Sequence, residues 1–269
     1  MSAGADLFGG AAIAAGYAAD RPPVHGQVLA LAAERGWLGG AARRALDLGC
    51  GAGASTSALL AALGDAPPVI AIDPAPAMVA AVGRVAPGAV GVVGAGEALP
   101  IADGSVDLIT AAGSLDFADL DRCLGEAARV LRPGGRLLVY DFGLGARLAS
   151  DRAPDLSPMI TAFHDRWPRL MSTRTPVTEA RLRGGAPAAG LAVEAHEPFE
   201  VVVPRTRAQY LAYLMTESNV TAAVAGGADP AAIRSWLDDA LPWPDAPEGE
   251  ATGVVFAGYL ALLVRSSVG

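Results

Sequence analysis

Residues 46–53 read Leu-Asp-Leu-Gly-Cys-Gly-Ala-Gly and join a short apolar run at residues 44–48 to a helix-like segment at residues 55–63. Glycines at such a junction permit a tight turn and let the backbone approach a ligand that a Cβ atom would exclude. Gly49-x-Gly51-x-x-Ala54 also fits the dinucleotide fingerprint. Asp47, however, suits a cationic ligand group better than a pyrophosphate. The stretch predicts a ligand-binding turn, with a plain strand-to-helix turn as the alternative reading.

Strand-like and helix-like segments alternate outward from this turn. The expected strands are residues 44–48, 69–72, 89–93, 106–110 and 136–140, and the expected helices among them are residues 55–63, 74–84 and 119–131. Alternation at this spacing indicates βαβ units, and hence an α/β fold with a parallel sheet covered by helices on both faces.

The sequence pattern changes after residue 143, where polar segments that contain Pro residues interrupt the strand–helix alternation. We expect a single domain over residues 1–269. Its expected parts are N-terminal helices in residues 1–40, a ligand-binding core in 41–145, helical cap insertions in 150–175 and 205–248, and a last strand in 253–265. A strand is also expected at residues 199–203.

Charge and composition narrow the class of partner. The formal net charge is −8 and the sequence pI is about 4.9, which argues against a surface built for nucleic acid or an anionic membrane. Cys50 and Cys123 form neither a disulfide framework nor a metal-site pattern. Residues 1–17 lack the basic start of a signal peptide, and the apolar run 253–264 is too short for a bilayer span. We therefore expect a reduced, cytoplasmic protein with a small-molecule partner and no bound metal; its oligomeric state is not predictable.

Five motifs in order resemble the class I S-adenosylmethionine-dependent methyltransferases, in their small-molecule branch. They are Asp-Leu-Gly-Cys-Gly-Ala-Gly at residues 47–53, Ala-Ile-Asp at 71–73, Glu-Ala-Leu-Pro at 97–100, Asp-Gly-Ser-Val-Asp-Leu-Ile at 103–109 and Leu-Arg-Pro-Gly-Gly-Arg-Leu at 131–137. The resemblance covers about residues 10–142. It implies a Rossmann-like, doubly wound sheet of seven strands whose last strand is antiparallel. It also implies S-adenosylmethionine as cofactor and S-adenosylhomocysteine as product.

Position and resemblance together predict the cofactor site. Asp73 ends the second strand, where its carboxylate can accept hydrogen bonds from both ribose hydroxyls; the alternative is a helix N-cap. Related proteins carry an acidic residue at the position of Ala95, so the adenine contact departs from the family pattern. The residues expected to bind the cofactor are Tyr17, Arg21, Asp47, Gly49, Cys50, Gly51, Gly53, Asp73, Pro74, Met78, Gly96, Glu97 and Ala112.

No fixed catalytic motif is visible, which is consistent with methyl transfer, since an activated methyl group mainly needs alignment. The candidate bases are His164, Asp116 and Asp141, with His25 and His196 as weaker ones. Aromatic and Met residues of the expected cap either line an acceptor pocket or pack the cap: Trp167, Tyr210, Tyr213, Met215 and Trp236.

Three functions remain open from the sequence. The first is methyl transfer to O, N or C of a small molecule, with secondary metabolism as the expected setting. The second is another S-adenosylmethionine-dependent reaction, such as a cyclisation. The third is binding of the cofactor without catalysis.

Overall fold

The computed structural model describes residues 20–38, 44–64, 68–150, 153–168, 175–245, 247 and 249–267. The strands are β1 (Ala45–Leu48), β2 (Ile70–Asp73), β3 (Val90–Val93), β4 (Val106–Ala112), β5 (Leu131–Phe142), β6 (Arg147–Leu148), β7 (Leu191–Arg205) and β8 (Thr252–Arg265). The α-helices are α3 (Val24–Glu34), α4 (Ala54–Leu63), α5 (Pro76–Val85), α6 (Leu120–Val130), α7 (Ser157–Arg166), α8 (Glu179–Gly185), α9 (Arg207–Leu214), α10 (Ser218–Ala225) and α11 (Pro230–Ala240). Two short 3-10 helices, η1 (Leu115–Phe117) and η2 (Pro187–Ala189), complete the described elements.

The strands form one sheet in the order β3-β2-β1-β4-β5-β8-β6, and β7 pairs with β8. Strands β1 to β5 are mutually parallel, whereas β8 runs antiparallel to β5, β6 and β7. The predicted Rossmann-like sheet with an antiparallel last strand is confirmed. The described sheet has eight strands instead of the expected seven, because the two residues of β6 pair with β8 beyond the point where β5 ends.

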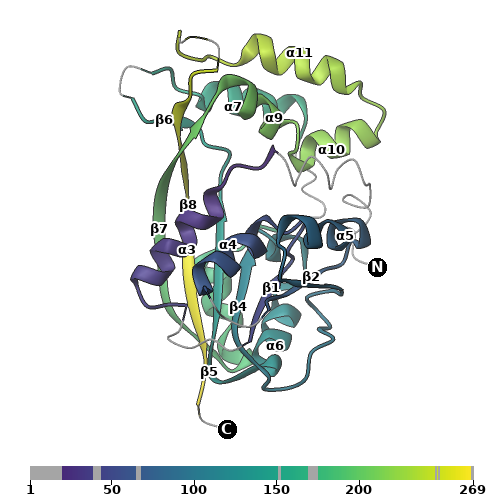
Figure 1. Ribbon diagram of the computed structural model, residues 1–269, viewed down its shortest axis with the longest axis vertical. Coiled ribbons are helices and arrows are strands. Elements are labelled where there is room, and N and C mark those ends of the chain that lie inside the picture. The colour runs from purple at the N-terminus through teal and green to yellow at the C-terminus, as the bar shows by residue number, and fades with distance from the viewer. Residues whose placement is uncertain are drawn as a thin grey trace.

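Helices cover both faces of this sheet (Figure 1). Side chains alternate across each strand, so Leu108 and Leu138 join the hydrophobic cluster that contains α3, whereas Ile109 and Leu137 join the cluster that contains α6. Both faces are therefore buried, as expected for parallel strands connected by helices.

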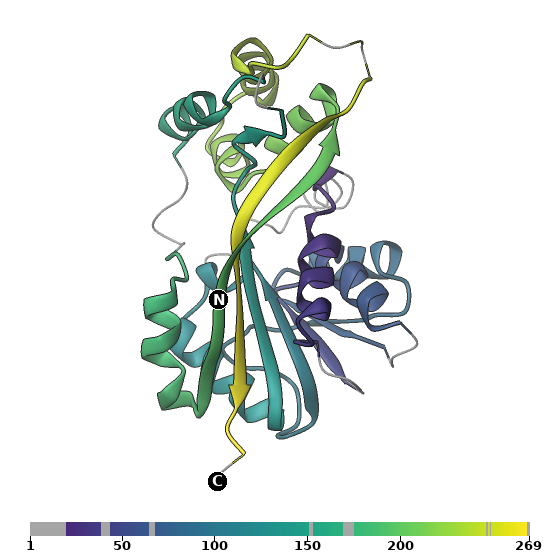
Figure 2. The ribbon, with the colours of Figure 1, turned by 90° about the vertical axis from the view of Figure 1, so that its left-hand side faces the viewer.

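The helices α7, α9, α10 and α11 gather at one end of the molecule (Figure 1). The long strands β7 and β8 run from the core up into this group, as Figure 2 shows in green and yellow. Since β5 and β7 both end in its direction, the group lies beyond the carboxyl ends of the parallel strands. We call α7 and α9–α11 the cap.

Aromatic packing joins the two segments that form the cap. The rings of Trp167, after α7, and Trp236, on α11, meet edge to face with centroids 5.1 Å apart. Asn219 Nδ2 donates to the Trp167 carbonyl at 2.9 Å. The segment from the first expected insertion thus packs against the second.

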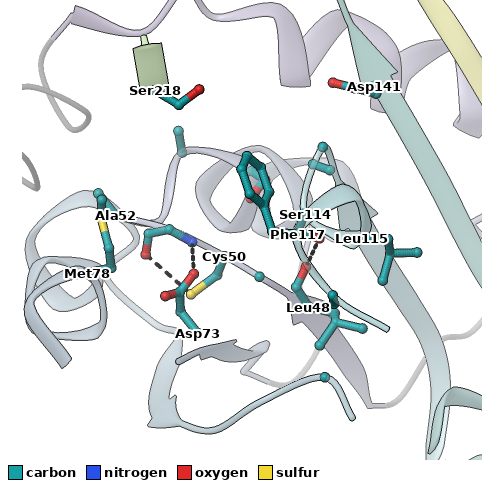
Figure 3. Close-up of a pocket in the computed structure, with 18 of the residues that line it drawn as sticks. Leu48, Cys50, Ala52, Asp73, Met78, Ser114, Leu115, Phe117, Asp141 and Ser218 are labelled. Atoms are coloured by element: carbon teal, nitrogen blue, oxygen red, sulfur yellow. Dashed lines mark hydrogen bonds between the residues drawn. The ribbon is translucent and has the colours of Figure 1, made fainter. Parts of the chain in front are cut away.

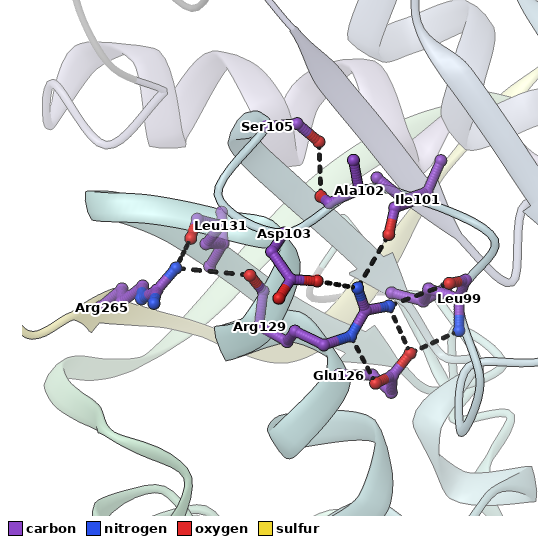
Figure 4. Close-up of polar contacts among 9 residues, drawn as sticks. All are labelled: Leu99, Ile101, Ala102, Asp103, Ser105, Glu126, Arg129, Leu131 and Arg265. Atoms are coloured by element: carbon purple, nitrogen blue, oxygen red, sulfur yellow. Dashed lines mark hydrogen bonds and ion pairs between the residues drawn. The ribbon is translucent and has the colours of Figure 1, made fainter.

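Arg129 of α6 fastens the connection between β3 and β4 (Figure 4). Its guanidinium donates to the carbonyls of Leu99 and Ile101, each at 2.9 Å, and pairs with Asp103 and Glu126. Both carboxylates hold the pKa of Arg129 above its usual value. The same connection carries residues 94–97, which matter for the site described below.

Several expected boundaries need correction. The last parallel strand starts at Leu131 instead of residue 136, directly after α6 ends at Val130, so Pro133-Gly134-Gly135 lies in β5. The strand expected at 199–203 extends over Leu191–Arg205 because it pairs along the whole of β8. Helix α5 begins at Pro76, so Pro74 lies outside it. Helix α10 and strand β6 were not anticipated.

Candidate functional site

A cavity of about 230 Å³ lies at the carboxyl ends of β1, β2, β4 and β5. Leu48, Asp73, Ala112 and Phe142 line it from the ends of these four strands. Loops, α3 and the cap contribute further walls. In Figure 3, Asp73 lies on one side of the space, and Asp141 and Ser218 lie on the other. This is the edge where doubly wound sheets bind their ligands.

The glycine turn after β1 forms one wall. Gly49, at φ +69°, could not carry a side chain, because a Cβ atom there would lie 2.2 Å from Ser114 Cβ. The backbone N–H groups of Gly49 and Cys50 both donate to the Ile72 carbonyl, which holds the turn against β2. Gly51, at φ +52°, lines the cavity, and a Cβ atom there would enter open space. The turn therefore leaves a cradle at Gly51 that a side chain would fill.

The carboxylate of Asp73 lies beside this cradle. Its Oδ2 accepts the Gly51 N–H and its Oδ1 accepts the Ala75 N–H, each at 2.9 Å. Burial raises the pKa of Asp73, and the two N–H donors oppose that rise. Each carboxylate oxygen has more than one acceptor position. A pair of neighbouring hydroxyls can therefore bind the same carboxylate.

Asp47 lies behind the turn rather than in the cavity wall. It is fully buried and accepts hydrogen bonds from the hydroxyls of Ser55, Thr56 and Thr110 at 2.6 to 2.9 Å. These donors come from α4 and β4. Burial raises the pKa of Asp47 while the hydroxyls lower it. The structure corrects the expected ligand contact: Asp47 connects β1, α4 and β4 beneath the turn.

One end of the cavity is formed by the β3–β4 connection and the start of α6. Gly96, Glu97, Phe117 and Cys123 line it. Glu97 Oε1 accepts the Asp119 N–H at 3.1 Å, so this side chain is held at the start of α6. A Cβ atom at Gly96 would lie 2.9 Å from Cys123 Sγ. We call this end of the cavity the slot.

The opposite end is formed by α3, the end of β5 and the cap. His25, Asp141, Phe142, Leu144, Tyr213, Glu217 and Ser218 line it. Arg21 pairs with Glu217 at 3.2 Å, and its guanidinium carbon lies 5.4 Å from the centroid of the Tyr213 ring. Asp141 Oδ1 accepts the Phe142 N–H at 2.8 Å. This end combines aromatic and aliphatic walls with a small set of polar groups.

Residues 46–139 match a family model described as a methyltransferase domain. These residues form a class I S-adenosylmethionine-dependent methyltransferase domain. The cofactor of this superfamily is S-adenosylmethionine, and the cradle at Gly51 and the Asp73 carboxylate fit its ribose.

Three similar proteins illustrate the relationship. A malonyl-[acyl-carrier protein] O-methyltransferase of Methylococcus capsulatus is 43% identical over 136 residues, which are 48% of this chain and 49% of that protein. An uncharacterised methyltransferase of Mycobacterium tuberculosis is 43% identical over 100 residues, 37% of this chain and 40% of the relative. A solved putative type II methyltransferase from Anaeromyxobacter dehalogenans is 27% identical with a TM-score of 0.57, covering 89% of this chain and 96% of the other. The chain thus spans less than half the length of the two curated relatives.

Most of the residues expected at the cofactor site line the cavity. They are Arg21, Gly49, Cys50, Gly51, Asp73, Pro74, Met78, Gly96, Glu97 and Ala112. Gly53 does not line it; a Cβ atom there would lie 3.4 Å from Val82 Cα, so this glycine allows α5 to pack closely. Tyr17 lies outside the described residues.

Two of the three candidate bases are not in the cavity wall. Asp116 is buried, and its Oδ1 accepts the Val177 N–H at 2.8 Å, so it fastens a neighbouring segment. His164 lies on α7, with its ring 5.5 Å from that of Phe163. Asp141 alone of the three lines the cavity. Proximity in sequence to a strand end did not distinguish Asp116 from Asp141.

One of the aromatic residues expected in the cap lines the cavity, and the others pack in or against the hydrophobic core. Tyr213 lines the cavity, whereas the hydroxyl of buried Tyr210 lies 3.0 and 2.9 Å from the carbonyls of Leu144 and Gly145. Trp167, Trp236 and Met215 pack against the hydrophobic cluster.

Sequence reasoning missed several lining residues, namely Ser114, Phe117, Phe142, Glu217 and Ser218. Ser114 and Phe117 follow the carboxyl end of β4, so the rule that ligands bind there could have found them. Glu217 and Ser218 reach the cavity only because α10 folds over it. No local pattern signals that.

Within the described residues, no group of three or more His, Cys, Asp or Glu side chains could hold a metal ion. None of the described helices is long and apolar enough to cross a membrane.

Proposed function

We propose that this protein transfers a methyl group from S-adenosylmethionine to an oxygen, nitrogen or carbon atom of a small molecule. The observation that carries the proposal is that one cavity contains both a site for the cofactor and a separate end for the acceptor. Asp73 and Gly51 offer a ribose cradle at one side, and α3, β5 and the cap enclose room for a second molecule at the other.

Particular residues are proposed to hold the cofactor. Asp73 would accept hydrogen bonds from the ribose hydroxyls, and Gly49 to Gly51 would pass beneath the nucleoside. The slot of Gly96, Glu97 and Phe117 would take the adenine ring. When bound, S-adenosylmethionine supplies an electrophilic methyl group on a positively charged sulfur. The chain's own contribution is alignment, which can supply on the order of 7–11 kcal/mol.

The cap is proposed to act as a lid that selects the acceptor. Residues 205–248 contribute Tyr213, Glu217 and Ser218 to the cavity wall, and residues 150–175 support them through the Trp167–Trp236 contact. Helices inserted at the carboxyl ends of the strands can exclude water from a bound cofactor. The setting we propose is a cytoplasmic enzyme of secondary metabolism.

A carrier-bound acyl group is the second candidate acceptor. The match to a malonyl-[acyl-carrier protein] O-methyltransferase over 136 residues favours it. Two alternatives stay open: the chain catalyses a different S-adenosylmethionine reaction, which would give a different product, or it only binds the cofactor, which would give no product.

Calorimetric titration with S-adenosylmethionine, S-adenosylhomocysteine and NAD tests the cofactor. We expect binding of the first two and none of NAD. In Asp73→Ala the affinity should fall about tenfold or more, since hydrogen bonds to a charged group contribute about 1.5–3 kcal/mol each. NAD binding in place of the sulfonium cofactor would exclude the proposal.

Incubation with methyl-labelled S-adenosylmethionine and a panel of acceptors tests the reaction. The panel includes small molecules and malonyl-carrier protein. Formation of S-adenosylhomocysteine with a labelled acceptor supports methyl transfer. Methylthioadenosine would indicate a different chemistry, and binding without turnover would indicate a binding protein.

A further inference from the structure

His25 lies on the first turn of α3 and lines the cavity. We call the end formed by α3, the end of β5 and the cap the acceptor end, because the proposed function places the methyl acceptor there. Its ring stands edge to face against Tyr140 and Phe142, with centroids 5.8 and 5.5 Å apart. Asp141 and Tyr213 line the same end. The contacts with two aromatic rings fix the orientation of the imidazole, so its two nitrogens have distinct surroundings.

Tyr140 forms a hydrogen bond with one of these nitrogens, Nδ1. Its side chain is fully buried, and its hydroxyl oxygen lies 3.0 Å from His25 Nδ1. Among the described residues this is the hydrogen bond found for that hydroxyl. Burial also raises the pKa of Tyr140, so the phenol keeps its proton. A buried hydroxyl that fails to donate is unfavourable, so the O–H of Tyr140 donates to Nδ1.

Three influences keep the His25 ring neutral at physiological pH. Burial lowers its pKa to about 4, and the positive charge of Arg21 acts in the same direction. The start of α3 also disfavours an imidazolium ion, because the helix dipole is positive there. Glu217, which lines this end, is paired with Arg21. A neutral imidazole that accepts at Nδ1 carries its one proton on Nε2.

We propose that His25 is an acceptor-binding residue that donates an Nε2–H hydrogen bond to a carbonyl or carboxylate oxygen of the methyl acceptor. The proposal rests on the proposed function and narrows its substrate class. Nδ1 is taken by Tyr140, so Nε2 is the ring nitrogen available to a molecule in the cavity. Because Nε2 already holds a proton, it cannot accept one from an alcohol or amine. Tyr140 is then a positioning residue that fixes the tautomer.

Nitrogen-15 NMR of the histidine rings tests the tautomer without any substrate. The chain has three histidines, so the His25 signals are assigned as those lost in His25→Gln and retained in His164→Gln and His196→Gln. We expect a protonated Nε2, an unprotonated Nδ1 and no titration until about pH 4. Tyr140→Phe should give a mixture of tautomers. A protonated Nδ1 in the wild-type neutral ring, or a titration near pH 6.5, would overturn the proposal.

Acceptor kinetics test the role in binding, using the acceptor identified in the labelled panel. His25→Gln keeps an N–H donor on its side-chain amide, whereas His25→Leu has none. We expect kcat/KM to fall about tenfold or more in His25→Leu and to recover in part in His25→Gln. The Kd of S-adenosylhomocysteine should stay within about threefold in both variants, since His25 lies at the acceptor end. An acceptor without a carbonyl or carboxylate oxygen, or an unchanged kcat/KM in His25→Leu, would refute the assignment. Failure of the proposed function is recognised separately, as absent cofactor binding in the wild type.

Discussion

Gly51 offers a way to separate backbone strain from ligand contact at the scale of one residue. It has φ +52° and Gly190 has φ +80°, and a Cβ atom at either position would meet nothing within 4 Å. Only Gly51 lines the cavity. We expect Gly51→Ala and Gly190→Ala each to lose about 1 kcal/mol of unfolding free energy, because L-residues disfavour positive φ.

The two variants should differ in cofactor affinity. Gly51→Ala places a methyl group in the cradle, so calorimetry should show S-adenosylhomocysteine binding weakened by about tenfold or more. Gly190→Ala should bind as the wild type does. Equal affinities in the two variants would mean that the cofactor does not pass close to Gly51.

His25 should make the stability of the protein sensitive to acid. Its pKa is about 4 in the folded state and about 6.5 when unfolded. The unfolded chain therefore binds more protons at this residue between pH 6.5 and 4, and folding is progressively disfavoured as pH falls through that range. A difference of this size corresponds to about 3 kcal/mol. Below pH 4 both states are protonated and the effect stops growing.

Comparison with His25→Gln isolates this contribution, because other buried groups titrate in both proteins. The variant lacks the acid penalty, so its destabilisation relative to the wild type should shrink by about 3 kcal/mol between pH 7 and pH 4. Urea unfolding at several pH values measures it. A difference that is constant with pH would show that the ring has the same pKa in the folded protein as in the unfolded chain.

The sequence could locate Asp73 and the glycine turn because both follow from strand ends, which a linear pattern can mark. It could not tell that Asp47 lies behind the turn. That depends on Thr110 of β4 and the hydroxyls of α4 converging on one buried carboxylate. Asp116 and Asp141 show the same limit, since Asp116 follows β4 and Asp141 lies near the end of β5, but only Asp141 lines the cavity.

At the scale of elements, the parallel strands were predictable because each is a short apolar run ended by a turn. The long strands were not, because their length is set by pairing. β7 extends from residue 191 to 205 because β8 pairs with it along its whole length. Likewise β6 is two residues that gain strand geometry from Val254 and Val255. Contacts distant in sequence decide such elements.

The Arg129 network gives a prediction at this scale. Arg129→Met keeps the aliphatic stem but removes the donors to the Leu99 and Ile101 carbonyls. We expect a loss of about 1–2 kcal/mol in unfolding free energy, since hydrogen bonds involving a charged group are the stronger ones. Cofactor affinity should fall a few-fold, because the loosened connection carries Gly96 and Glu97.

Arg183→Met serves as the matched control. Arg183 makes an exposed ion pair with Glu179 four residues earlier in α8, and such pairs contribute less than about 1 kcal/mol. Its variant should unfold within about 0.5 kcal/mol of the wild type, with unchanged affinity. If chemical denaturation gave equal losses for the two variants, the network would be no more than another surface pair.

For the whole molecule, the sequence indicated a cap but not how it is joined to the core. One hydrophobic cluster contains Val28 of α3, Phe163 of α7 and Leu237 of α11. The strands β7 and β8 also run through both parts (Figure 2). A cap built in this way has no separate core of its own. We therefore expect cap and core to unfold together in a single transition.

Urea unfolding followed by two probes tests this cooperativity. Three of the four tryptophans, Trp167, Trp236 and Trp243, belong to the cap segments, so fluorescence reports mainly on the cap, while circular dichroism reports on all helices and strands. The two midpoints should coincide in the wild type. They should also coincide in Leu237→Ala, which removes a fully buried cap side chain and should lose about 2–5 kcal/mol. Leu124→Ala, equally buried on α6 in the other cluster, should shift both midpoints in parallel. A fluorescence transition that precedes the circular dichroism transition in Leu237→Ala would instead make the cap a separately folding lid.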